Sequence, residues 1–108
     1  MKLETAGSLS SEDVTIEELR QACGDVRGRG DFLILSSGEQ HYMQVAGLDE
    51  PFVIEYREGS EAEHYEGAQE FCQSEMEAIL VAYLMGECAW KSMYQWRKIE
   101  KKPWWRFW

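Results

Sequence analysis

The chain has 108 residues, of which 20 are acidic and 11 basic, so its net charge is −9 at neutral pH. This length fits one domain with one core, and a hydrophobic content of 44% indicates a globular protein rather than a disordered one. No apolar run approaches the ~20 residues that a membrane-spanning helix needs. The acidic charge repels nucleic-acid phosphates and anionic membranes, so we expect neither as a partner and favour a basic protein.

The charge is divided unevenly along the chain. Residues 1–87 hold 19 acidic and 5 basic residues, a net of −14, whereas residues 88–108 hold 1 and 6, a net of +5. Residues 100–108 form a basic, aromatic tail that ends in KKPWWRFW. We predict that this tail docks on the acidic body of its own chain or of a second copy, which leaves a homodimer open. Contact with a partner protein and a disordered end are the alternatives.

The N-terminal part is predicted to be a leader followed by a helix. Residues 1–13 lack the apolar segment of a secretory signal, and we expect them to form a polar leader. Thr15 and Glu18 have the spacing of a capping box, which predicts the start of a helix. Gly24 is then expected to end that helix.

Four strands are predicted next, at residues 31–36, 41–46, 52–57 and 60–65. The first is apolar without alternation, which is typical of a central strand. A tight two-residue turn around Gly59 would join the last two strands. The short links throughout predict an antiparallel meander.

A second helix follows the strands. Ser74 and Glu77 have capping-box spacing, and Gly86 is placed to end the helix. The helix would carry an apolar stripe consisting of Met76, Ile79, Leu80, Tyr83 and Leu84. Residues 94–99 are a candidate fifth strand. The whole chain, 1–108, is therefore predicted to be a single α+β domain: a two-layer sandwich with the order α-β-β-β-β-α and an optional terminal strand.

Alternation along the predicted strands separates a polar face from an apolar one. Glu55, Arg57 and His64 fall on the polar face, and the acidic hairpin lies beside it. Such a surface favours contact with a basic partner, and Trp and Arg are common at binding hot spots. The predicted partner-binding residues are Glu55, Arg57, Glu61, Glu63, His64, Trp104 and Trp105.

No catalytic or metal-binding pattern stands out. His41 and His64 are the only histidines, and they lack the spacing of a metal motif. The three cysteines, Cys23, Cys72 and Cys88, contain no CxxC pair and are expected to be reduced cytosolic thiols. We therefore expect a cytoplasmic protein that is not an enzyme and that holds no cofactor and no metal.

The runs FLILSS, HYMQVAG, FVIEYREGSEAEHY and YLMGECAWKSMYQW resemble small bacterial proteins of the Imm1-like group of toxin-immunity proteins. The resemblance covers residues 32 to 96 and does not extend to the tail. Glu87 stands after Gly86 where the pattern has aspartate. The resemblance implies a non-enzymatic protein that blocks a cognate toxin.

The leading functional hypothesis is a non-catalytic protein-binding module, an immunity-type inhibitor that occludes a basic partner. The alternatives are a small acidic chaperone of the secretion type, which would bind extended segments as a dimer, and a structural or interaction domain. A small enzyme or ligand-binding domain would instead place a ligand near His41 or His64.

Overall fold

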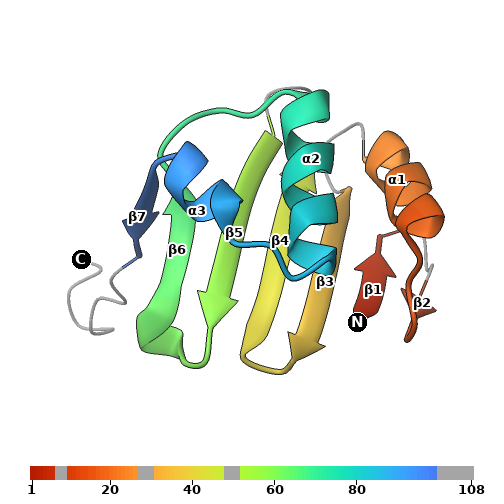
Figure 1. Ribbon diagram of the computed structural model, residues 1–108, viewed down its shortest axis with the longest axis horizontal. Helices are drawn as coiled ribbons and strands as arrows, with labels where there is room; N and C mark the ends of the chain where they lie inside the picture. The colour runs from red at the N-terminus through yellow and green to blue at the C-terminus, as the bar shows by residue number, and fades with distance from the viewer. Residues whose placement is uncertain (7–9, 27–30, 48–51, 100–108) are drawn as a thin grey trace, which may run out of the picture.

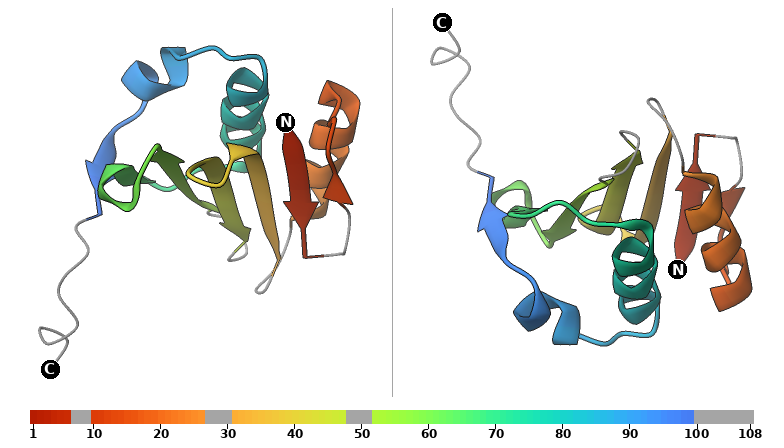
Figure 2. Two further views of the ribbon diagram at one scale, coloured as in Figure 1. Left: turned by 90° about the horizontal axis from the view of Figure 1, so that it is seen from below. Right: turned by 90° about the horizontal axis from the view of Figure 1, so that it is seen from above.

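The computed structural model describes residues 1–6, 10–26, 31–47 and 52–99. They form an antiparallel sheet with the strand order β2-β1-β3-β4-β5-β6-β7 and helices on one side of it only (Figures 1 and 2). The strands are β1 Lys2–Thr5, β2 Ser10–Ser11, β3 Phe32–Gly38, β4 His41–Gly47, β5 Phe52–Glu58, β6 His64–Gly67 and β7 Trp96–Lys98. The helices are α1 Ile16–Asp25, the 3-10 helix η1 Glu61–Glu63, α2 Gln73–Leu84 and α3 Ala89–Met93. The α+β class is confirmed, but the predicted four to five strands and two helices were too few.

The N-terminal segment is part of the sheet, so the prediction of a polar leader was wrong. β1 pairs with β3, and Leu3 lies opposite Leu35 with no exposed surface. β2 pairs with the outer side of β1. A strand whose only buried side chain is Leu3 gains its stability from pairing with a distant strand, and that pairing is not visible in local sequence.

Helix α1 begins as predicted. The Glu18 amide donates to Thr15 Oγ1 at 3.2 Å, and the Thr15 amide donates to Glu18 Oε1 at 3.1 Å, which completes the capping box. The helix does not end at Gly24 but continues through Asp25. Gly24 does not adopt the left-handed backbone conformation of a helix-terminating glycine, which Gly59 and Gly86 adopt among the described residues.

The long strands β3, β4 and β5 form the middle of the sheet. Leu33 and Leu35 of β3 are fully buried under the helices, whereas Phe32 is 37% exposed on the other side. β3 is therefore an interior strand of the sheet, as its apolar sequence predicted. Only one of its two faces is covered by helices, and the other faces solvent.

The β5–β6 connection differs from the predicted tight turn. The turn includes η1, and β6 begins only at His64, which pairs with Arg57. Gly59 adopts a φ of 99°, a backbone conformation that favours glycine, and its amide donates to the Gln40 carbonyl at 2.7 Å. The predicted assignment of side chains to the two faces of the sheet is still correct, because Tyr65 lies opposite Tyr56.

The N-terminal cap of helix α2 lies two residues before the predicted one. The Cys72 amide donates to the Glu75 carboxylate at 3.0 Å, so the box lies at Cys72 and Glu75 rather than at Ser74 and Glu77. Met76, Ile79 and Leu80 are buried against the sheet, as the apolar stripe predicted. Gly86 adopts a φ of 76° just after the helix, which confirms it as the terminating residue.

The short helix α3, absent from the sequence prediction, packs on the sheet through aromatic rings. Trp90 is 4% exposed and meets Tyr56 edge-on, with ring centroids 4.9 Å apart. Trp96 of β7 contacts both rings and donates its indole N–H to the Trp90 carbonyl at 3.3 Å. β7 lies within the predicted 94–99 range. Among the described residues, the helices are too short or too polar to cross a membrane.

Candidate functional site

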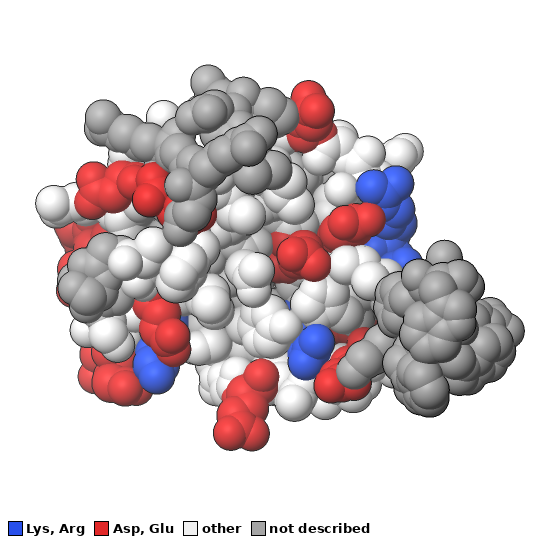
Figure 3. Space-filling model, turned by 180° about the vertical axis from the view of Figure 1, so that it is seen from behind, with Lys and Arg blue, Asp and Glu red and all other residues white. Residues whose placement is uncertain are grey.

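The side of the sheet opposite the helices is the candidate site, and we call it the helix-free face. Figure 3 shows this side, where both signs of charge are interspersed among uncharged side chains. Strand register and alternation assign its members. They are Lys2, Glu4, Phe32, Ile34, Ser36, Tyr42, Gln44, Ala46, Val53, Glu55, Arg57, His64, Glu66 and Arg97.

A chain of side-chain hydrogen bonds crosses this face. His64 Nε2 lies 3.1 Å from Glu55 Oε1, and Arg57 Nε donates to His64 Nδ1 at 3.1 Å. Arg57 Nη1 donates to Gln40 Oε1 at 3.0 Å. Because Nδ1 accepts from Arg57, the ring proton of neutral His64 is on Nε2 and points to Glu55. We call Gln40, Arg57, His64 and Glu55 the polar chain.

Tyr42 adds an aromatic wall to the polar chain. The Arg57 guanidinium lies 5.3 Å from the centre of the Tyr42 ring, and His64 meets the same ring edge-on at 5.9 Å. Tyr42, Arg57 and His64 are direct neighbours across three adjacent strands. The Arg57 side chain is thus held by an aromatic ring, an imidazole and an amide at once.

The charges of the helix-free face are balanced. Glu66 accepts from Arg97 Nε at 2.7 Å, and Lys2 Nζ lies 3.1 Å from Glu4. With Glu55 and Arg57, the strands contribute three carboxylates and three cations to this face. The strand residues of this face therefore carry no net charge.

A groove of about 710 Å³ opens beside Tyr42. Its floor combines Ile34, Ser36, Tyr42 and Gln44 of β3 and β4, and its walls include Lys2, Glu4, Glu12 and Glu39. The small side chains Ser36 and Ser37, together with Gly38 and the irregular register there, leave room for it. The groove and the polar chain are contiguous through Tyr42.

The predicted site residues are only partly brought together. Glu55, Arg57 and His64 join in the polar chain, whereas Glu61 and Glu63 lie in η1. Glu63 accepts from the Tyr65 hydroxyl at 2.6 Å and lies 3.5 Å from Lys98, and both contacts lower the pKa of its carboxyl.

Two further predicted residues, Trp104 and Trp105 of the tail 100–108, lie outside the described residues. The sequence reasoning missed Gln40 and Tyr42. Alternation along β4 places Tyr42 on the polar side, but its contact with Arg57 depends on strand register.

Both ring nitrogens of His64 have partners within the polar chain. Burial and the charge of Glu77 raise the pKa of Cys23 to about 12, which keeps this thiol neutral. Across the described ranges, no group of three His, Cys, Asp or Glu residues is arranged to hold a metal ion.

The chain matches no protein-family model, and searches of curated proteins and of solved structures find no significant match. The resemblance to Imm1-like immunity proteins therefore stays a prediction.

Proposed function

We propose that the chain is a non-catalytic protein-binding module whose helix-free face covers a basic partner protein, as an immunity-type inhibitor would. The observation that carries the proposal is the polar chain, an ordered set of Arg, His, Glu and Gln side chains on a sheet face that no described helix covers. His64 is only 14% exposed in its side chain, so part of the set is already desolvated.

The fixed geometry of Arg57 supports a role in binding. Arginine and tyrosine are the residue types that most often dominate binding energy at protein interfaces. A free arginine side chain loses about 0.5–1.5 kcal/mol of conformational entropy when a partner immobilises it. Gln40, His64 and Tyr42 already hold Arg57 in the folded protein. Much of this side-chain entropy is therefore lost when the chain folds, and less is lost when a partner binds.

Charge acts at two ranges in this proposal. The net charge of −9 attracts a basic protein from a distance and raises the association rate. At contact, the balanced helix-free face selects by hydrogen bonds and shape rather than by net charge. The groove beside Tyr42 offers room for partner side chains at the centre of the contact.

The free thiols fit a reducing compartment, which we propose to be the cytoplasm. Cys23, Cys72 and Cys88 are all unbridged, and two of them are exposed.

Affinity capture from the native host with the full chain tests the proposal. Wild type and the variants Arg57→Ala, Tyr42→Ala and Gln21→Ala serve as baits, with captured proteins quantified by mass spectrometry at low and high salt. We expect wild type and Gln21→Ala to retain the same basic protein. Both helix-free-face variants should lose it.

Gln21→Ala is the matched control, because Gln21 is an exposed polar residue of α1, a helix on the other side of the sheet. Capture of the same basic protein in equal amounts by all four baits would contradict the proposal. So would a captured set with no basic member, or one that high salt does not weaken.

A further inference from the structure

Helix α2 carries an apolar stripe on its outer surface as well as on its inner one. Ala78, Val81, Ala82 and Met85 follow the spacing i, i+3, i+4, i+7 and line a groove of about 360 Å³. Met85 is 58% exposed and Ala78 is also exposed, whereas Val81 and Ala82 are half-buried and also pack against the core. We call these four residues the outer stripe.

An ordinary surface helix buries one side and presents polar residues on the other. The inner side of α2 is satisfied, since Met76, Ile79 and Leu80 are at most 1% exposed against the sheet. Ser74 and Glu77 of α2 line the groove beside the outer stripe. This second stripe has the pattern by which a helix packs against another helix.

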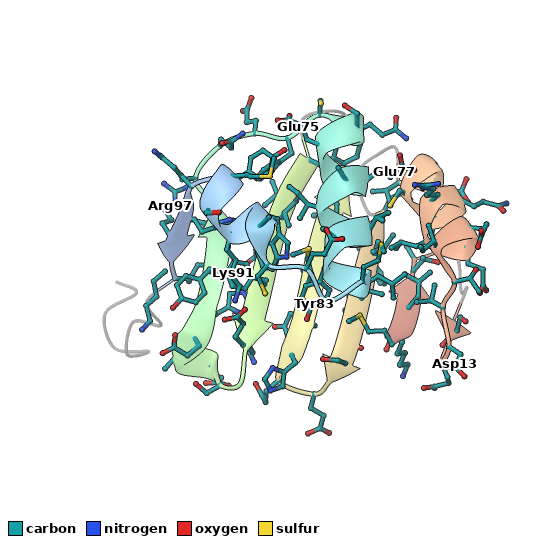
Figure 4. The ribbon with its side chains drawn as sticks, in the orientation of Figure 1. Asp13, Glu75, Glu77, Tyr83, Lys91 and Arg97 are labelled. Atoms are coloured by element: carbon teal, nitrogen blue, oxygen red, sulfur yellow. The ribbon has the colours of Figure 1, made fainter. Side chains whose placement is uncertain are left out.

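Acidic residues surround the outer stripe. Glu77 and Glu87 line the same groove, together with the single cation Arg20, and Figure 4 shows Glu77 on the side of α2 that faces α1. Together α1 and α2 carry five carboxylates (Glu17, Glu18, Asp25, Glu75, Glu77) and one cation, Arg20. None of the ion pairs found among the described residues involves these five carboxylates.

The acidic charge around the groove determines which kind of molecule can bind there. A second copy would bring its own −9 charge to the contact, and anionic lipids or nucleic acids would also be repelled. We propose that the groove between α1 and α2 binds an amphipathic helix of a partner protein, with an apolar stripe and basic flanks. This contact is independent of the helix-free face and goes beyond the function proposed above.

A synthetic peptide provides the first probe. A fluorescent Leu–Lys amphipathic helix of about 18 residues, or five turns, is titrated with the full chain and followed by anisotropy. A Leu–Glu peptide of the same pattern is the charge control. We expect saturable binding of the Leu–Lys peptide that weakens with salt, and no binding of the Leu–Glu peptide.

Matched double variants separate the groove from general charge attraction. Ala78→Gln with Met85→Gln places two uncharged polar side chains in the groove at exposed positions. Ala89→Gln with Met93→Gln makes the same two changes on α3, where both residues are also exposed. We expect the groove pair to weaken peptide binding about tenfold, the effect of losing roughly 1.4 kcal/mol of apolar contact, and the α3 pair to leave it unchanged.

Two outcomes would overturn the inference. Equal binding by the two double variants would show that the peptide sits elsewhere on the acidic surface. A wild-type dimer in sedimentation equilibrium that the groove pair dissociates would make a second copy the occupant. Arg57→Ala should bind the peptide as wild type does, so failure of the proposed function and failure of this inference are distinguishable.

Discussion

The two faces of the sheet are held by different kinds of interaction. On the covered face, Leu33, Met43 and Ile54 have no exposed surface and pack under the helices. On the helix-free face, Arg57 and His64 are joined by hydrogen bonds and remain partly exposed. The contrast separates two kinds of stabilisation: the apolar face supplies the free energy of folding, and hydrogen bonds hold the polar side chains of the other face in a fixed arrangement.

The largest expected effect compares neighbours on β5 that point to opposite faces. Ile54→Ala should lower the free energy of unfolding by about 2–5 kcal/mol, because it leaves a cavity in the core. Val53→Ala on the helix-free face should cost about 1 kcal/mol, the range of sheet-surface substitutions. Urea denaturation of both variants measures the difference. Equal losses would show that the helix-free face is not solvent-facing.

The next effect probes packing at the end of β6. A Cβ atom at Gly67 would lie 2.7 Å from Cζ of Phe71 and still closer to Cε2, so the ring would have to move. Gly67→Ala should therefore destabilise the fold by about 1–3 kcal/mol in thermal denaturation.

Gly24→Ala is the matched control for this substitution, since no heavy atom lies within 4 Å of its Cβ position. It sits in α1 and should stabilise the protein by about 0.5–1 kcal/mol. If both variants shifted stability in the same direction, the close approach of Phe71 to Gly67 would be wrong.

A smaller effect distinguishes two arginines on the helix-free face. Arg57→Ala leaves His64 Nδ1 and Gln40 without their donor and should cost about 1 kcal/mol. Arg97 is 66% exposed in its side chain and pairs only with Glu66 in the contacts described, so Arg97→Ala should cost at most about 0.5 kcal/mol. Chemical denaturation resolves the two. A reversed order would mean that the polar chain does not restrain Arg57.

The smallest effect concerns the cap of α2. The Cys72 amide lowers the pKa of the Glu75 carboxyl, so the cap stabilises the fold above the ordinary carboxyl range. That contribution is lost as the pH falls through the lowered pKa. Glu75→Gln should be less stable than wild type at neutral pH, and the gap should close in acid.

Thermal denaturation of wild type and Glu75→Gln at a series of pH values from acid to neutral measures this difference in stability. The control is Glu87→Gln, which changes an exposed carboxylate beyond the C-terminal end of α2. A gap of constant size at every pH would rule out the charged cap.

Local patterns predicted the elements whose signals lie within a few residues. The Thr15–Glu18 capping box and the alternation of β5 are both of this kind. β1 and α3 were missed because each depends on distant partners: Leu3 packs through β3, and Trp90 packs on Tyr56 of β5. Their burial could not be read from neighbouring residues.

The sequence predicted which residues share the face of the candidate site, but not which of them contact one another. Alternation placed Arg57 and His64 on one face, and the structure confirms that. Their hydrogen bond required the register that η1 creates, and Gln40 joined only because the β3–β4 turn reaches the same end of β5. Part of the surplus of acidic charge, which suggested the hairpin as the contact, lies on α1 and α2.

Site-specific photocrosslinking tests whether the helix-free face contacts a basic protein. A photoreactive phenylalanine analogue replaces Tyr42 on the helix-free face or, as the control, Met93, which is 70% exposed on α3. Each full-length protein is irradiated in the native host extract and analysed by mass spectrometry. We predict a covalent adduct with a basic protein from position 42 and none from position 93. An adduct with that protein from position 93 alone would contradict it.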